Sequence, residues 1–222
     1  TNTGPARSIR SFTMLHKNTQ AYTGYTLVEL ILALGIISFI SMAVITFQIS
    51  VIRGSATMQA GLITQQQVRK TFSQFSHEAR TAVPAPSGAA ALLEVATSSL
   101  IFYANVDTDA DIERVKYFLG TTSVIARTEF YKQVINPVGG VYANSNELLS
   151  VMVQSIVGTT TPIFTYYNSD YAGTSTPLVQ PVTTTAVRHI KMALPVDPNA
   201  GRSPIFQTYS TQVTLRNLKD NL

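Results

Sequence analysis

Three aspartates at alternate positions of one short segment, Asp107, Asp109 and Asp111, are the side chains best spaced to hold a metal ion. Carboxylates at this spacing can converge on a hard cation such as Ca²⁺. The segment departs from the EF-hand pattern, because Ile112 stands where that loop needs glycine and Phe118 where it needs glutamate. A solvated hairpin turn is the alternative. The segment is therefore either a calcium site or a turn that binds no ion. We expect no other cofactor in this chain.

The side-chain sets that enzymes use for nucleophilic or metal-assisted catalysis do not occur in the sequence. There is no cysteine, which excludes a thiolate nucleophile and Cys-ligated metal sites. His77 and His189 have no ligand or nucleophile at a motif spacing, and no nucleophile elbow, Walker loop or HExxH motif is present. We therefore expect a protein that is not an enzyme.

Glu29 is the last charged residue before an uncharged run that continues to Ile52. A carboxylate at the edge of a lipid-bound helix is costly, by about 2.5–3.5 kcal/mol if it is drawn to the bilayer centre. Such a residue usually marks a site with a partner. The alternative is a helix cap, because Thr26-x-x-Glu29 has the capping-box pattern. The two roles can coexist, and both remain open at this stage.

The uncharged run is long enough to cross a membrane. Leu30–Ile49 is a run of 20 residues without a charge, and about 20 apolar residues match a hydrocarbon core of ~30 Å. The first 24 residues contain Arg7, Arg10 and Lys17 but no acid, which places the N-terminus in the cytoplasm by the positive-inside rule. We predict a single pass through the cytoplasmic membrane over residues 25–52. A buried core helix is the alternative. A cleaved secretory signal does not fit, because its apolar region would be only about 7–15 residues long.

One long helix is expected because no proline occurs from Ala6 to Val83. We predict a helix from Tyr25 to Ala82, whose outer half, residues 53–83, is amphipathic. Its apolar stripe consists of Met58, Leu62, Val68, Phe72, Phe75 and Ala79. Polar residues are expected mostly on the other faces: Gln65, Gln66, Arg69, Lys70, Gln74 and Glu78. The stripe needs a partner surface, and the following domain is the obvious candidate.

The rest of the chain has the pattern of β-strands. Residues 84–88 contain two prolines and a glycine, and are expected to form a linker to a β-rich domain over residues 89–222. Strands are predicted at Leu92–Ala96, Leu100–Val106, Ile112–Leu119, Val124–Tyr131, Val187–Leu194 and Phe206–Leu215, while Glu147–Val157 fits a helix or a strand. The fold class is therefore α+β, with an antiparallel sheet packed on the outer half of the helix.

A specific signature stands at the boundary of the apolar run, Gly24-Tyr25-Thr26-Leu27-Val28-Glu29. A short basic leader, a glycine, an aromatic residue, T-L-x-E and about twenty apolar residues follow one another in this order. In these parts and their spacing the chain resembles the type IV pilins and the pseudopilins of type II secretion and competence systems. The resemblance implies the pilin fold, in which a long N-terminal helix packs on an antiparallel sheet.

The resemblance also implies processing and partners. A prepilin peptidase would cut between Gly24 and Tyr25, remove the leader of residues 1–24 and N-methylate Tyr25. Glu29 would then compensate the terminal ammonium of Tyr25 on a neighbouring subunit. The implied partners are other pilin or pseudopilin subunits, an assembly platform in the cytoplasmic membrane, and membrane lipid before assembly. The product would be a filament outside the cytoplasm, built on a core of apolar helices.

Two absences favour a minor subunit over a major one. The apolar half of the helix has no proline, and the chain has no cysteine pair to close a C-terminal loop, whereas major pilins often have both. Looser patterns are similar to minor pilins of the W type and pseudopilins of the J type. These patterns are Leu100–Tyr103, Val115–Leu119, Ile125–Arg127 and Thr214–Leu218.

The charge distribution argues against nucleic acid as a partner. Although the net charge is +4, only 13 basic and 12 acidic side chains remain once the first 24 residues are left out, and they include no basic run that could follow a phosphate backbone. Two alternatives to the filament subunit stay open. One is a single-pass membrane protein whose outer domain binds a ligand or the cell surface, and the other is a DNA-capturing minor pilin of an uptake system.

Overall fold

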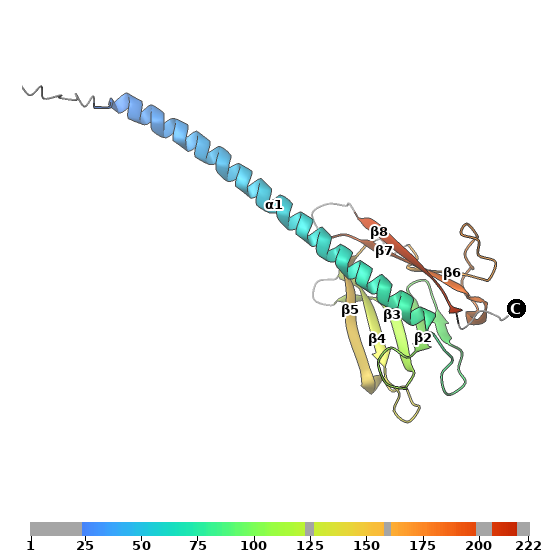
Figure 1. Ribbon diagram of the computed structural model, residues 1–222. Helices are drawn as coiled ribbons and strands as arrows, with labels where there is room; N and C mark the ends of the chain where they lie inside the picture. The colour runs from blue at the N-terminus through green and yellow to red at the C-terminus, as the bar shows by residue number, and fades with distance from the viewer. Residues whose placement is uncertain (1–23, 123–126, 158–160, 199–205, 217–222) are drawn as a thin grey trace, which may run out of the picture. The chain divides into compact units, whose positions relative to one another are not determined.

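A computed structural model describes residues 24–122, 127–157, 161–198 and 206–216. The chain divides into two compact units, Thr1–Val51 and Ile52–Leu222. One long helix, α1 (Leu27–Arg80), runs from the first unit into the second, and the β-strands all follow it (Figure 1). The class is α+β, as the sequence predicts.

The length of α1 follows from the lack of proline, and residues close to each end determine where the helix begins and ends. Thr26 caps the first turn, and beyond Arg80 the backbone leaves the helix before Pro84. The predicted helix, from Tyr25 to Ala82, extends two residues too far at each end. Tyr25 precedes the capping residue, while Ala82 lies past the last helical turn.

Eight strands in the described residues form one antiparallel sheet in the order β1-β2-β3-β4-β5-β7-β6, with β8 beside β7. Their bounds are β1 (Leu92–Val95), β2 (Ser99–Ala104), β3 (Glu113–Thr122), β4 (Arg127–Ile135), β5 (Glu147–Ile156), β6 (Phe164–Tyr167), β7 (His189–Val196) and β8 (Gln207–Thr214). A single pair, Ile156 with Val196, joins β5 to β7. The sheet therefore consists of a five-stranded part and a three-stranded part that meet at this one point.

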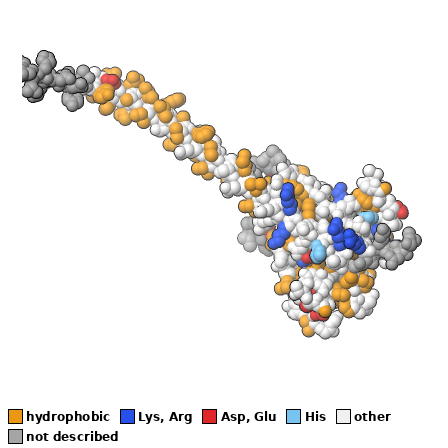
Figure 2. Space-filling model, viewed as in Figure 1, with side chains coloured by type: hydrophobic (Ala, Val, Ile, Leu, Met, Phe, Trp, Pro, Cys, Tyr) orange, Lys and Arg blue, Asp and Glu red, His pale blue; other side chains and the backbone are white. Residues whose placement is uncertain are grey.

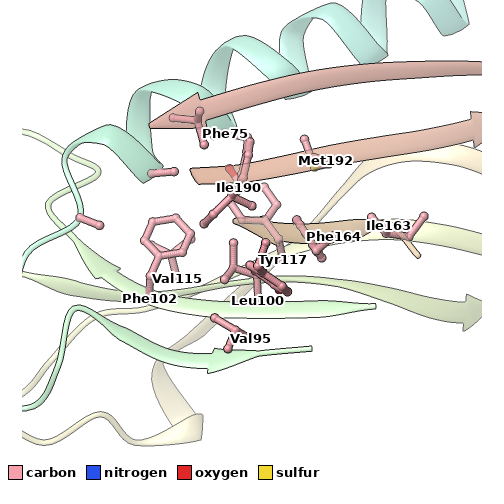
Figure 3. Close-up of a cluster of buried hydrophobic side chains, with 14 of the residues drawn as sticks. Phe75, Val95, Leu100, Phe102, Val115, Tyr117, Ile163, Phe164, Ile190 and Met192 are labelled. Carbon is pink, nitrogen blue, oxygen red and sulfur yellow. The ribbon is translucent and has the colours of Figure 1, made fainter. Parts of the chain in front are cut away.

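The core lies between the C-terminal part of α1 and both parts of the sheet. In Figure 3, Phe75 of α1, Tyr117 of β3 and Phe164 of β6 point toward one another. The Phe75 ring meets the edge of the Tyr117 ring at 5.4 Å between centroids and lies 6.0 Å from the Phe164 ring. Aromatic pairs of this kind add about 0.5–1.5 kcal/mol beyond the area that they bury. Phe75 therefore ties the helix to both parts of the sheet.

Buried and more exposed side chains alternate along two of the strands. In β3, Val115 and Tyr117 are fully buried, while Arg114 and Lys116 lie on the other face. In β8, Val213 is buried and Gln212 is exposed. Period-two patterns thus identify the inner face of the sheet correctly.

Several strand predictions need correction. β6 was not predicted, and its four residues are too short to show a periodic pattern. β3 begins one residue later than predicted and continues to Thr122, and β4 continues to Ile135. The part of the predicted strand at residues 124–126 lies outside the described residues. The ambiguous segment from Glu147 is the strand β5.

The apolar stripe of the outer helix is only partly covered. Val68, Phe75 and Ala79 are buried against the sheet, whereas Met58 is 73% exposed and Leu62 is 64% exposed. The expectation that the domain covers the whole stripe is therefore wrong for its first two turns.

Candidate functional site

The residues before α1 leave the Gly24–Tyr25 peptide bond outside the helix. Gly24, Tyr25 and Thr26 have no regular secondary structure, and all three are exposed. An ideal Cβ built on Gly24 would meet no atom within 4 Å. Within the described residues, nothing covers the bond that the resemblance marks for cleavage.

Only half of the expected capping box forms at the start of α1. The backbone N–H of Glu29 donates to Thr26 Oγ1 at 3.3 Å, which is the usual bond of an N-cap threonine. The reciprocal bond, from the Thr26 N–H to the Glu29 carboxylate, is absent among the described residues, and the Glu29 side chain is exposed. The cap thus accounts for Thr26 and leaves the carboxylate of Glu29 available to another group.

Apolar side chains surround the first half of α1 on all sides. Every described residue from 27 to 52 is exposed, and Figure 2 shows hydrophobic side chains along the visible face of this half. A helix that is apolar all round is stable only inside a membrane or a larger assembly. Among the described residues, α1 is the one helix long and apolar enough to span a membrane.

Four hydroxyl side chains of this half bond to their own helix. The hydroxyls of Ser38, Ser41, Thr46 and Ser50 each donate to the carbonyl oxygen four residues earlier, at 2.7–3.0 Å. Bonding of this kind satisfies the hydroxyl without water. These residues therefore lower the hydropathy of the run without adding unsatisfied polar groups.

The outer half of α1 carries a buried charge that the sequence prediction placed on a polar face. Glu78 is only 3% exposed and pairs with Lys132 of β4, which is also buried. Glu78 Oε2 accepts a hydrogen bond from the Tyr117 hydroxyl at 2.8 Å, and Oε1 accepts one from Gln74 Nε2 at 2.9 Å. Burial, together with the charge of Glu78 and its hydrogen bond, raises the pKa of Tyr117 well above its ordinary value. The cluster fastens α1 to β3 and β4.

The acidic segment between β2 and β3 brings together a different trio from the predicted one. One carboxylate oxygen each of Asp107, Asp109 and Glu113 lies within 4.8 Å of the other two. Asp111 is not a member of this group. Instead its backbone N–H donates to Asp109 Oδ1 at 2.9 Å, just as the N–H of Asp109 donates to Asp107 Oδ1 at 2.9 Å. The group therefore contains Glu113, the first residue of β3, in place of Asp111.

Glu113 was missed by the motif because it lies in the strand and not in the acidic run. It is fully buried, and Glu113 Oε2 accepts a hydrogen bond from the Val106 N–H at 2.8 Å. Burial raises the pKa of Glu113, and the charges of Asp107 and Asp109 raise it further. The alternation of β3 holds the signal that could have found it, because Glu113 shares the inner face with Val115.

The two histidines of the described domain do not join either cluster. His77 is exposed on α1, whereas His189 Nδ1 lies 3.0 Å from Thr214 Oγ1 and its ring packs on Tyr171. Neither belongs to a group of three side chains that could hold a metal ion in the described part of the chain.

Compared with models of known protein families, with curated proteins and with solved structures, the chain matches none.

Proposed function

We propose that the chain is a membrane-anchored filament subunit of the pilin and pseudopilin kind, and that it is a minor subunit. The observation that carries the proposal is the sequence Gly24–Glu29 at the start of a helix whose apolar side chains are all exposed over residues 27–52. The cleavage signature and the anchor occur together and in the order that the resemblance requires. The pilin fold, with its helix and antiparallel sheet, is part of this proposal.

The exposed apolar half of α1 supports the membrane and filament roles together. Its side chains need a nonpolar surrounding, because each fully buried Leu or Ile gains about 1.5–3 kcal/mol over exposure to water. Lipid supplies this surrounding before assembly, and the same helices of other subunits supply it afterwards. The proposed orientation has the N-terminus in the cytoplasm and the β domain outside the cytoplasmic membrane.

Glu29 supports a specific contact within the filament. The N-cap bond comes from Thr26 and leaves the exposed carboxylate of Glu29 unused within the described residues. Cleavage before Tyr25 would create a positive terminus near the same boundary. The proposed contact pairs the Glu29 carboxylate of one subunit with the terminal ammonium of Tyr25 on the next, so that neither charge enters the apolar core alone.

Processing is tested by the mass and N-terminal sequence of the full chain, produced with a prepilin peptidase and purified from membranes in detergent. We expect loss of residues 1–24 and a methylated Tyr25. A Gly24→Leu variant places a bulky side chain at the cut and should keep its leader. Gly35→Leu, at an open position within α1, is the matched control and should be processed normally. A mature protein with another first residue would overturn the processing proposal.

A further inference from the structure

We propose that Asp107, Asp109 and Glu113 form a calcium site that holds the turn between β2 and β3 against the end of the sheet, with Asn136 as a fourth ligand. The site does not depend on the proposed filament function. It differs from the pattern in the sequence, since Asp111 is not part of it.

The distances suit one cation. The three carboxylate oxygens lie within 4.8 Å of one another. Oxygens on opposite sides of a bound Ca²⁺, each about 2.3–2.6 Å from it, are separated by up to about 5 Å. The three oxygens are therefore close enough together to share a single ion.

An unpartnered buried oxygen points to a missing ligand. Glu113 is 0% exposed, and its Oε1 has no hydrogen-bond partner among the described residues. A buried polar atom without a partner costs about 1–3 kcal/mol, and more when it is charged. Since Glu113 Oε2 is already held by the Val106 N–H, the carboxylate is oriented and one of its oxygens remains to be satisfied.

A second unpartnered oxygen lies at the same end of the sheet. Asn136 Oδ1 is buried and has no partner in the described part of the chain. Asn136 directly follows Ile135, which pairs with Arg114, the neighbour of Glu113 in β3. Asn136 and Asp107 also line the same groove. In the proposed site, this side-chain amide oxygen adds a fourth hard oxygen donor to the three carboxylates.

No side chain described here neutralises the three carboxylates. The buried Lys132 is already paired with Glu78. Arg114 is next to Glu113 in sequence, but its guanidinium bonds to Asn144 Oδ1 at 3.2 Å and lies over the Tyr142 ring. A divalent cation would supply the missing positive charge.

The ligand set favours Ca²⁺ over Mg²⁺. Several protein carboxylates with an amide oxygen in a turn are typical of calcium, which accepts six to eight oxygens in flexible geometry. Magnesium requires near-octahedral geometry, keeps several waters and is usually held by one or two carboxylates. Water can fill the remaining positions, because Asp107 and Asp109 are exposed.

The test uses the full chain in detergent, freed of metal with a chelator and then titrated with CaCl₂ or MgCl₂ in a calorimeter. We expect one Ca²⁺ per chain and weaker binding of Mg²⁺. Asp109→Asn should lower the calcium affinity about 10-fold or more. Asp111→Asn is the matched control, since it removes the same charge from the same loop but outside the trio, and its affinity should stay close to that of the unaltered chain.

A second measurement separates ligation from misfolding. Glu113→Gln removes the buried charge, so the chelator-treated variant should unfold at a higher temperature than the unaltered chain, while its unfolding temperature no longer rises with Ca²⁺. No binding at millimolar Ca²⁺ would overturn the proposal. Equal loss in Asp111→Asn and Asp109→Asn would also overturn it, because a diffuse acidic surface would then explain the binding. Equal binding of Mg²⁺ would overturn the assignment to calcium.

Discussion

Lys132 on β4 donates a hydrogen bond to Glu78 on α1 and forms an ion pair with it, so that a buried pair of charges joins the helix to the sheet. The Tyr117 hydroxyl and the Gln74 amide donate to the same carboxylate. The carboxylate is therefore fully satisfied, and its removal would leave Lys132 buried without its counter-charge.

We expect single substitutions in this pair to destabilise the domain strongly. Glu78→Leu or Lys132→Met should lower the free energy of unfolding by about 3–5 kcal/mol, since each leaves one buried charge unpaired. The double variant should lose less than either single one, because no charge then stays buried. Urea unfolding of the full chain in detergent measures these values. Lys70→Met, an exposed position of the same helix, is the control and should change stability by no more than about 0.5 kcal/mol. Additive losses in the double variant would contradict the coupling.

The raised pKa of Tyr117 predicts a loss of stability in alkali. An unfolded chain releases this proton near the ordinary value of 10.0, whereas the folded chain keeps it to a higher pH. Unfolding therefore releases a proton above pH 10.0, and stability falls there by about 1.4 kcal/mol per pH unit for this group. Tyr166, whose pKa burial also raises, adds to the loss.

Urea unfolding at several alkaline pH values checks this prediction. Tyr117→Phe should be less stable at neutral pH by about 1–3 kcal/mol, because Glu78 loses a donor. Above pH 10.0 its stability should fall less steeply than that of the unaltered chain. Parallel slopes would show that Tyr117 ionises at its ordinary pKa in the folded state.

The elements with strong local signals were predictable from the sequence. The lack of proline predicts α1, and the residue patterns at Ile112–Leu119 and Phe206–Leu215 predict β3 and β8. The burial of Glu78 could not be predicted from the sequence, for a physical reason. Helical periodicity classes a glutamate as solvent-facing, and only the pairing of α1 with β4 provides Lys132 as its partner, 54 residues away in sequence.

The candidate metal site was predictable only in part, for the same reason. The acidic run reveals Asp107 and Asp109, because they are close in sequence. Glu113 joins them through the register of β2 and β3, which pairs it with Ala104. Asn136 lies at the same end through the register of β3 and β4, which no local motif contains. The exposure of Met58 and Leu62 likewise depends on where the sheet ends along α1.

A charge in the middle of the apolar half of α1 should prevent membrane insertion. Ile40 is exposed, so substitution there disturbs no packing within the chain. Ile40→Lys places a charge near the middle of the predicted span at a cost of about 2.5–3.5 kcal/mol. We expect the variant to be extracted from membranes by alkaline carbonate, while Ile40→Phe stays in the membrane. Retention of Ile40→Lys would contradict a transmembrane role for this segment.

Glu29→Ala distinguishes the filament role from simple helix capping. The variant should still be processed to Tyr25 and remain in the membrane, because neither the cut nor the anchor changes. The terminal ammonium of the neighbouring subunit would then have no counter-charge. Breaking a buried ion pair costs about 3 kcal/mol or more. If this cost weakens the binding between subunits, the filament yield should fall about 100-fold. Sheared filaments, quantified against subunits left in the membrane, measure this yield.

Thr26→Ala is the matched control for Glu29→Ala. It removes the observed N-cap bond and costs the helix about 1 kcal/mol, but it leaves the carboxylate in place. We therefore expect Thr26→Ala to assemble far better than Glu29→Ala. Equal defects in both variants would assign Glu29 to the helix start alone. Normal assembly of Glu29→Ala would favour a single-pass protein that acts through its outer domain, since no subunit contact would then need the carboxylate.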